Sequence, residues 1–580
     1  SGKVNGDIKV NDHIDISANL GINKSKEQTN DVSYFSGGIA RAAVEAYSIL
    51  PIKYPNDPSI YGAYADQWSS NADFPAGETP HNPVHITNDV ETFTNRSQVT
   101  GDVTVNVKIT PELTFKSNIA IDLNLRKYNN YGGRAISTGN QGNANIDIEN
   151  TTYWQNENYF NYSKTIGDHA VTGMVGLSWS RYNWENLNTS NQYFFDDFYK
   201  WHNIGIGTAT RPAPSSWDGQ NSLNSYFARA NYTYKGKYLL TLTGREDGSS
   251  RFGAANRYGI FPAASAAWEV SKESFMAGSK TWLDMLKVRA GWGQSGNDQI
   301  GEYNMYSTFG TNGYTAAYNL NGTTGSAIAG FEPSTKGNAD VSWETTQTVN
   351  AGVNASMLNK KLTVAVDVWQ RKTSDMLYRL SVPQVMGIAR PPFVNIGEMK
   401  NSGIDIEVGY HNTLMAGKFT YALNATWSHY KNVVESLSNN LKEVVGYSER
   451  QVEYTRATAG MAYPMFYGLI ADGIIQTAAE AAAAPQFADY TTVGHYKYRD
   501  LNGDGLITMD KDRTFIGDPH PKFVGGLNVD LGYGNFDLNM FFYGSYGRQL
   551  ILAQDCQSLM VLHVHRKLQL HLSKTDLSLD

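Results

Sequence analysis

Apolar and polar residues alternate strictly over many short stretches of this 580-residue chain. In TVNAGVNASM every second residue is apolar, from Val349 to Met357, and the pattern resumes at Leu362 in LTVAVDVWQR. Successive side chains of a β-strand point to opposite faces, whereas a helix needs a period of 3.6 residues. The chain is therefore predicted to consist of amphipathic β-strands, and these two stretches to form a tight hairpin.

The same alternation recurs from one end of the chain to the other. It is clearest over residues 14–22, 113–125, 286–292, 404–410, 421–427, 527–533 and 536–542. Strands of ~9–11 residues with one apolar and one polar face suit a membrane β-barrel with a water-filled interior. A pass along the whole chain predicts about sixteen strands, and an even number is typical of single-chain bacterial barrels.

The connections between these strands alternate between short and long. The short ones contain Thr110, Gly167, Lys235, Asn359, Met415 and Gly534. The long ones run over residues 24–101, 127–152, 182–222, 295–344, 372–401 and 431–522. Outer-membrane barrels have short periplasmic turns and long extracellular loops, whereas a soluble sandwich or propeller has no reason to sort its connections. The predicted fold class is therefore all-β, an antiparallel transmembrane β-barrel.

Composition supports this class and excludes others. Aromatic residues make up 12% of the chain, with 36 Tyr and 12 Trp, as expected for strands that carry aromatic belts. The formal net charge of -7 does not favour nucleic acid as a partner. A single cysteine, Cys556, excludes a disulfide framework and a Cys-based zinc site.

The sequence shows neither a targeting signal nor a catalytic motif. The opening SGKVNGDIKV lacks the basic start and apolar core of a signal peptide, and no run of ~18 apolar residues predicts a transmembrane helix. No Ser/His/Asp order, nucleotide-binding loop or HExxH motif occurs, so the chain is not expected to be an enzyme.

The stretch YKYRDLNGDGLITMDKD, residues 496–512, resembles an EF-hand calcium loop. The twelfth position holds Lys511 instead of Glu, and the prolines that follow exclude a second helix. We therefore expect a structural calcium site and not a sensor; the alternative is an Asx-turn that only shapes the loop. The candidate ligands are Asp500, Asn502, Asp504, the carbonyl of Leu506, and one of Asp510 and Asp512.

Several long motifs resemble one family. GREDGSSRFGAANRYGIFPAASAAWEVSKESFM (244–276), LKVRAGWGQSGN (286–297), NIGEMKNSGIDIEV (395–408), FYGLIADGIIQ (466–476) and the calcium-like stretch occur in the order found in SusC-like TonB-dependent outer-membrane transporters of Bacteroidetes. The resemblance covers roughly residues 3–550. Its signature residues are Arg245, Asp247, Gly248, Ser249, Ser250, Arg251, Phe252 and Gly253.

These signature residues are expected to shape the tip between two strands and not to contact ligand. Asp247 and Arg251 could form an ion pair that locks the turn, while Ser249 and Ser250 could cap backbone groups.

The resemblance implies about twenty-two strands, a plug that fills the barrel, and a TonB box. We expect residues 1–550 to be a partial barrel domain without the plug, TonB box and C-terminal strands, and residues 551–580 to be an aberrant or frameshifted tail. Implied partners are a SusD-like lipoprotein, the TonB complex through an N-terminal segment, outer-membrane lipid and lipopolysaccharide, and an oligosaccharide or peptide substrate. The implied location is the outer membrane.

Aromatic and amide side chains in the loop from Asn188 to Asn203 could stack on sugar rings and bind hydroxyls; they could equally pack the loop or form an interfacial girdle. Two other functions remain open from sequence. The chain could be a passive porin or surface adhesin, or a soluble secreted carbohydrate-binding β protein.

Overall fold

The computed structural model describes residues 1–29, 83–134, 141–208, 214–310, 328–379, 390–437, 443–446 and 452–552. Outside these ranges it describes Ile39 and five short strands: β3 (Lys53–Tyr54), β4 (Asp57–Tyr61), β14 (Ala317–Tyr318), β24 (Ser448–Glu449) and β34 (His571–Ser573). The predicted boundary at residue 550 lies at the edge of these ranges. Most of the predicted tail lies outside the described residues.

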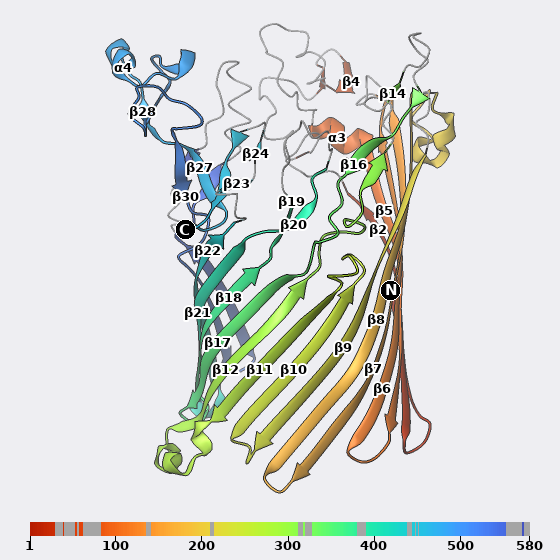
Figure 1. Ribbon diagram of the computed structural model, residues 1–580, viewed down its shortest axis with the longest axis vertical. Helices are drawn as coiled ribbons and strands as arrows, with labels where there is room; N and C mark the ends of the chain where they lie inside the picture. Colours follow the sequence, from red (N-terminus) through yellow and green to blue (C-terminus); the bar gives the residue numbers. More distant parts are fainter. Residues whose placement is uncertain are drawn as a thin grey trace.

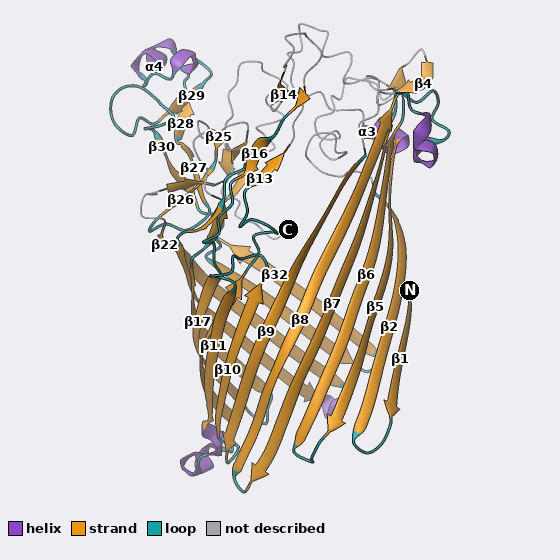
Figure 2. Cartoon of the chain, turned by 45° about the vertical axis from the view of Figure 1, so that its right-hand side comes forward, coloured by secondary structure: helices purple, strands orange, loops and turns teal. Residues whose placement is uncertain are grey.

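One antiparallel sheet of sixteen strands dominates the fold, and its strands follow one another in sequence order (Figure 1). The strands are β1 (Gly2–Lys9), β2 (Ile14–Gln28), β5 (Val90–Lys108), β6 (Leu113–Gly132), β7 (Asn143–Ile166), β8 (His169–Gln192), β9 (Ser215–Tyr234), β10 (Tyr238–Ser249), β11 (Tyr258–Glu269), β12 (Leu283–Asn297), β17 (Glu344–Met357), β18 (Leu362–Ser374), β21 (Glu398–Leu414), β22 (Phe419–Ser436), β31 (Phe523–Tyr533) and β32 (Phe536–Tyr546). The sheet curves into most of a barrel, with β1 and β32 as its edges (Figure 2). The predicted strand number and barrel class are confirmed.

Tight turns join the strands at one end, which we call the short-turn end. They hold the residues predicted from sequence, including Gly167 between β7 and β8 and Gly534 between β31 and β32, both with positive φ. One exception is the connection from β11 to β12, which contains two short helices, η2 (Val270–Lys272) and η3 (Ser274–Ser279). All long connections leave the opposite end, the long-loop end.

Smaller elements lie mainly in the long connections. The strands there are β13 (Thr308–Gly310), β15 (Ile328–Ala329), β16 (Glu332–Thr335), β19 (Leu377–Arg379), β20 (Phe393–Asn395), β23 (Glu443–Val445), β25 (Val452–Glu453), β26 (Thr455–Thr458), β27 (Met465–Leu469), β28 (Ala471–Ile474), β29 (Tyr496–Tyr498), β30 (Arg513–Gly517) and, after the sheet, β33 (Leu550–Leu552). The helices are α3 (Pro83–Asp89), η1 (Lys200–Ile206), α4 (Ala478–Ala483), η6 (Ala488–Tyr490) and, at a tight turn, η5 (Met415–Gly417). No helix in the described ranges has the length and apolar character needed to cross a bilayer.

The apolar faces of the strands point outward, and no second layer covers them among the residues that the structure describes. On β6, Ile119, Ile121 and Leu125 are 59%, 42% and 47% exposed. The same face of the neighbouring strands exposes Leu20, Ile22, Val103, Leu240, Leu242, Val288, Val349, Val353 and Val368. An apolar surface of this extent is costly in water but favourable against lipid tails. We call it the apolar band.

Three polar side chains interrupt the apolar band near the short-turn end. Ser117 donates a hydrogen bond to Asn158 (2.8 Å), and Asn158 donates one to Asn156 (2.6 Å). Because these groups satisfy one another, they reduce the cost of facing lipid.

The strands differ greatly in length. β7 and β8 have 24 residues each, whereas β10 and β11 have 12. On β6 the outward residues change from Leu125 to Lys127, so the extra length lies beyond the apolar band at the long-loop end. The sequence prediction placed these strand ends too close to the band, because the polar extensions show no alternation of apolar and polar residues.

An aromatic belt marks the membrane interface at the short-turn end. The rings of Tyr238 and Trp268 stack 6.4 Å apart, and both donate hydrogen bonds to Glu273 in the η2–η3 turn, at 2.6 and 3.1 Å. Hydrogen bonds from Tyr238, Lys237 and Trp268 lower the pKa of Glu273 to about 2. A lowered carboxyl pKa adds stability above the unfolded-state value, and this is lost only as the pH falls through about 2. The belt therefore stays anchored at any physiological pH.

The orientation of the two faces predicts opposite tolerance to charge at adjacent positions. Leu123 points to the lipid side and Asn124 to the interior. Leu123→Arg should lower the free energy of unfolding by about 2–4 kcal/mol, because an arginine in the middle of the lipid layer is poorly solvated, while Asn124→Arg should cost far less. Urea titration of the folded, heat-modifiable species measures both. Equal losses would contradict the assignment of faces.

Candidate functional site

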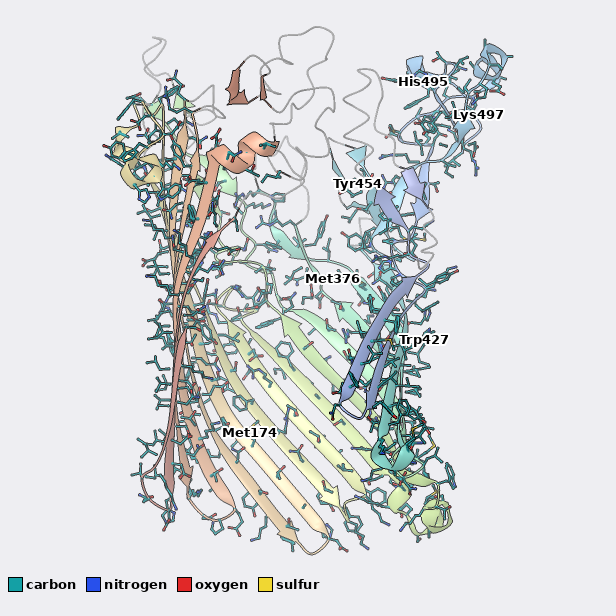
Figure 3. All side chains as sticks on the ribbon, turned by 180° about the vertical axis from the view of Figure 1, so that it is seen from behind. Met174, Met376, Trp427, Tyr454, His495 and Lys497 are labelled. Carbon is teal, nitrogen blue, oxygen red and sulfur yellow. The ribbon has the colours of Figure 1, made fainter. Side chains whose placement is uncertain are left out.

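The concave face of the sheet is lined by polar and charged side chains (Figure 3). Arg126 bonds Glu149 (2.9 Å) and Asp147 (3.0 Å) on the next strand, and Arg289 of β12 pairs with Asp367 of β18. Each of these residues is one position away from an outward apolar residue, so the period of two places them inside. Ion pairs in a watery bore contribute little to stability; their effect is to keep the bore hydrophilic.

A hollow of about 670 Å³ opens on this inner face along β1 to β7. Two pairs of amide and carboxylate side chains line it. Asn19 donates to Asp102 at 3.0 and 3.1 Å, and Gln98 donates to Asp122 at 3.0 Å. The ring of Tyr153 completes the wall. Such paired donors and acceptors beside an aromatic ring are suited to hydroxyl or amide groups of a hydrophilic ligand.

These inner residues belong to no sequence motif, but the strand register would have identified them. The tight turn around Thr110 fixes the register, so that Val107 lies opposite Phe115 and Gln98 lies opposite Asn124. Counting back from this turn brings Gln98 next to Asp122 on the inner face.

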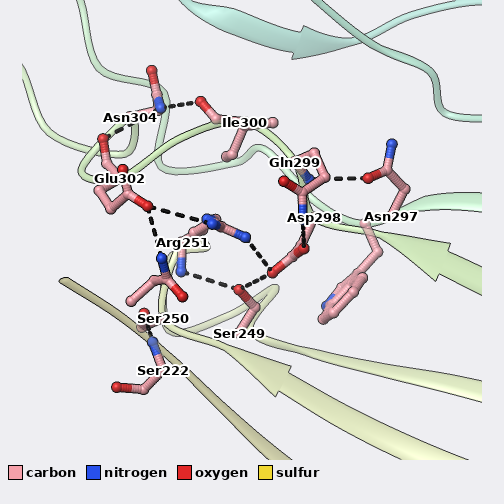
Figure 4. Close-up of polar contacts among 12 residues, drawn as sticks. Ser222, Ser249, Ser250, Arg251, Asn297, Asp298, Gln299, Ile300, Glu302 and Asn304 are labelled. Carbon is pink, nitrogen blue, oxygen red and sulfur yellow. Dashed lines mark hydrogen bonds and ion pairs between the residues drawn. The ribbon is translucent and has the colours of Figure 1, made fainter. Parts of the chain in front are cut away.

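The signature residues lie where β10 ends, and their contacts hold the neighbouring long loops together (Figure 4). Arg251 forms ion pairs with Asp298 (3.1 Å) and Glu302 (3.3 Å) of the loop after β12. Next to it, Phe252 is fully buried against Ile300 and Val341. The motif thus ties together three segments that are distant in sequence.

The predicted ion pair between Asp247 and Arg251 is wrong. Asp247 instead pairs with Arg245, at 2.7 Å, because both side chains lie on the inner face of β10, two residues apart. Arg251 lies beyond the strand end and turns toward Asp298 and Glu302. Residues four apart share a face only within a continuous strand. Because β10 ends before Arg251, this residue does not share the inner face with Asp247.

The two serines cap backbone groups as the sequence suggests. Ser249 Oγ accepts from the backbone N–H of Arg251 (3.2 Å) and donates to Asp298 (2.7 Å), while Ser250 Oγ accepts from the N–H of Ser222 (2.9 Å).

The two glycines of the motif allow close contacts. A β-carbon at Gly253 would lie 2.6 Å from the carbonyl oxygen of Ala339, and one at Gly248 would lie 2.4 Å from the ring of Tyr258. Larger residues do not fit at either position without movement of the neighbouring chain.

The calcium-like loop lies in the long excursion between β22 and β31, whose tip carries His495 and Lys497 (Figure 3). The two carboxylate oxygens of Asp500 accept from the N–H groups of Gly503 (2.6 Å) and Gly505 (2.7 Å). Asp504 accepts from the N–H of Leu506 (2.9 Å) and lies 3.3 Å from the ammonium of Lys511. Asn502 donates to Asp504 at 2.8 Å.

Asp512 closes this loop from within. It is fully buried and accepts from the N–H groups of Leu501 (3.0 Å) and Thr508 (2.7 Å), which lower its pKa together with the Thr508 hydroxyl. Asp510 stays exposed at the surface. No group of three or more acidic, His or Cys side chains suited to a metal occurs in the described part of the chain. The geometry favours the Asx-turn alternative, and calcium binding stays a prediction.

The loop from Asn188 to Asn203 does not lie over the bore. It turns over the outer face of the sheet, where Phe194 is buried edge-on against Tyr131 and Trp201 packs against Phe93. Figures 1 and 2 both place η1 outside the barrel wall. Loop packing, the alternative considered above, therefore accounts for Phe194 and Trp201.

Removal of Arg251 should loosen the loops that it fastens. Arg251→Ala leaves two mostly buried carboxylates unpaired and should destabilise the local structure by about 3 kcal/mol. Limited proteolysis within residues 298–343 should become faster by at least tenfold, whereas Arg257→Ala, an exposed arginine in the same turn, should change nothing. Equal cleavage of the two variants would disprove that Arg251 holds these loops together.

The loop around Asp512 should hold its shape without metal. Asp512→Asn replaces an acceptor oxygen with an NH₂ group and should open the loop, at a cost of about 1–3 kcal/mol. Protease cleavage between residues 500 and 512 in EDTA should rise for this variant and not for Asp510→Asn. If EDTA alone makes the unmodified loop as sensitive as the variant, a bound cation and not Asp512 maintains it.

Comparison with known families and proteins agrees with the fold. The family model described as "TonB dependent receptor-like, beta-barrel" matches residues 47–552. TonB-dependent receptor P26 of Formosa agariphila is 30% identical over 473 residues, which is 79% of this chain and 46% of the relative. TonB-dependent receptor SusC of Bacteroides thetaiotaomicron is 30% identical over 327 residues, 55% of this chain and 31% of the relative. The chain thus spans less than half the length of these relatives.

Solved structures share the same architecture. The structure of the RagAB peptide transporter superposes with a TM-score of 0.75 at 20% identity, over 95% of this chain and 57% of that one. The RagAB peptide importer in its open-open state gives the same TM-score at 19% identity. These structures share the fold; the family match and the sequence relatives show that the chain belongs to the TonB-dependent receptor β-barrel family, in its SusC-like branch, whose barrels lie in the outer membrane.

Proposed function

We propose that this chain forms the barrel wall of an importer that carries oligosaccharides, or peptides, across the outer membrane. A SusD-like lipoprotein would sit at the mouth of this barrel. The observation that carries the proposal is the inner hollow with its paired side chains, Asn19 with Asp102 and Gln98 with Asp122. Import, and not catalysis, is the role that this polar wall supports.

The chemistry of the hollow suits ligands rich in hydroxyl groups. Each carboxylate that accepts from one amide keeps lone pairs for a sugar hydroxyl, and each amide keeps a second N–H. Peptide backbones offer complementary N–H and C=O groups too, so the proposal includes both oligosaccharides and peptides. The fold likeness to a protein described as a peptide transporter is a reason to test peptides in parallel.

The alternatives from sequence fare differently. A soluble secreted protein does not fit an outer-membrane family with an exposed apolar band. A passive porin differs from the proposed importer in needing no energy. The dependence on TonB, like the lipoprotein partner, comes from the family resemblance.

Uptake measurements test the proposal. Cells that produce the intact protein should accumulate a labelled oligosaccharide or peptide, and a protonophore should abolish accumulation. Replacing Gln98 and Asp122 by Ala together should weaken ligand binding about tenfold, because two hydrogen-bonding groups are lost. Leu123→Ala, next to Asp122 but on the lipid side, serves as the matched control.

Two outcomes would contradict the proposal. Uptake that continues in the presence of a protonophore would indicate a passive pore. An unchanged affinity in the Gln98→Ala/Asp122→Ala variant would remove the hollow from the ligand path.

A further inference from the structure

A pocket of about 550 Å³ lies on the outer face of the barrel wall at the long-loop end of β2, β5 and β6. The segment containing η1 lies outside the wall there (Figures 1 and 2), and residues 201–205 of this segment line the pocket. Its polar lining consists of Lys26, Asn95, Lys127, Asn129, His202 and Asn203. The pocket is separate from the bore, since it opens on the opposite face of the sheet.

The lining is rich in groups that bind anions. Lys26 lies directly opposite Asn95 in the strand register, and Asn95 lies directly opposite Lys127, so two ammonium groups flank one amide in a single row. No Asp or Glu is among the described residues that line the pocket. Glu91, which lies on the same face of β5, already pairs with Lys200 of η1.

Asn129 provides a second, independent sign of a ligand. Its side chain is only 3% exposed, and its amide oxygen has no hydrogen-bond partner in the described structure. A buried amide without a partner is costly, because it has lost water and gained nothing in return. The unpaired oxygen is an acceptor, so it favours a ligand that carries hydroxyl or N–H donors beside its anionic group.

The pocket is held in shape before any ligand binds. The amide of Asn191 donates to the carbonyls of Ile204 (2.8 Å) and Gly207 (2.9 Å), which fixes the η1 segment. The Trp201 ring packs edge-on against Phe93, with the ring centres 5.4 Å apart, and the Lys26 ammonium lies over the Phe93 ring, 4.3 Å from its centre. Preorganised side chains lose little entropy on binding.

The height of the pocket identifies the source of the anion. Lys26 is two residues beyond Lys24, which in turn follows the outward apolar residues Leu20 and Ile22. On β6, Lys127 follows Leu125 in the same way. The ammonium groups therefore lie just past the apolar band, at the level of lipid head groups, and on the side that faces lipid.

We propose that this pocket binds the phosphate of a lipopolysaccharide molecule in the outer leaflet. The acyl chains of the lipid would lie along the apolar band formed by Leu20, Leu123 and Leu125, while Lys26 and Lys127 hold its phosphate. The bound lipid thus attaches the η1 segment to the membrane surface. This inference rests on the outer-membrane location and not on the transported ligand.

Native mass spectrometry of the intact protein in detergent tests the proposal, with phosphorylated lipid A as the probe. Lys26→Ala/Lys127→Ala should bind this lipid about thirty-fold more weakly, since each lysine near an anionic head group contributes about fivefold. Lys26→Arg/Lys127→Arg should restore binding, which separates loss of charge from misfolding. The matched control is Lys164→Ala/Lys235→Ala, which removes two ion-paired lysines at the short-turn end.

Three results would overturn the inference. The first is equal binding by the Lys26→Ala/Lys127→Ala variant while its heat-modifiable band shows a folded barrel. The second is equal affinity for lipid A from which the phosphate has been removed. The third is displacement of lipid A by millimolar inorganic phosphate, which would identify a site for a soluble anion.

Discussion

The whole structure depends on one constraint, which is that backbone N–H and C=O groups in a lipid layer must find partners within the protein. The sixteen antiparallel strands meet this constraint through continuous ladders, except along the outer edges of β1 and β32; one example is the unbroken pairing of Asn143–Ile166 with His169–Gln192. Once the backbone is fixed in this way, each side chain has only two places to go. The outward position meets lipid and the inward position meets water. The alternation of side chains along each strand therefore produces both the apolar band and the polar bore.

This constraint explains which features could be predicted from sequence. The strand number and the tight turns followed from alternation and from residues such as Gly534, because both are local properties. The strand ends of β5 to β8 did not, since beyond the lipid layer nothing demands alternation.

The sites were harder to predict than the fold. The capping by Ser249 and Ser250 followed from local chemistry, but the partners of Arg251 lie some fifty residues away in another loop, and no local rule finds them. The aromatic loop from Asn188 to Asn203 has a composition suited to ligand binding, yet tertiary packing of Phe194 and Trp201 places it outside the wall. Composition shows what a loop can contact, while only the fold shows which way it turns.

The unequal strand lengths have a consequence for the shape of the mouth. Because β7 and β8 are twice as long as β10 and β11, the rim is cut obliquely (Figure 2). Its high side consists of the extended, paired strands β7 and β8. Its low side is built up by loops that Arg251 holds together. A solute that approaches the bore therefore passes paired strands on one side and loops on the other, so the two sides of the opening offer it different surfaces.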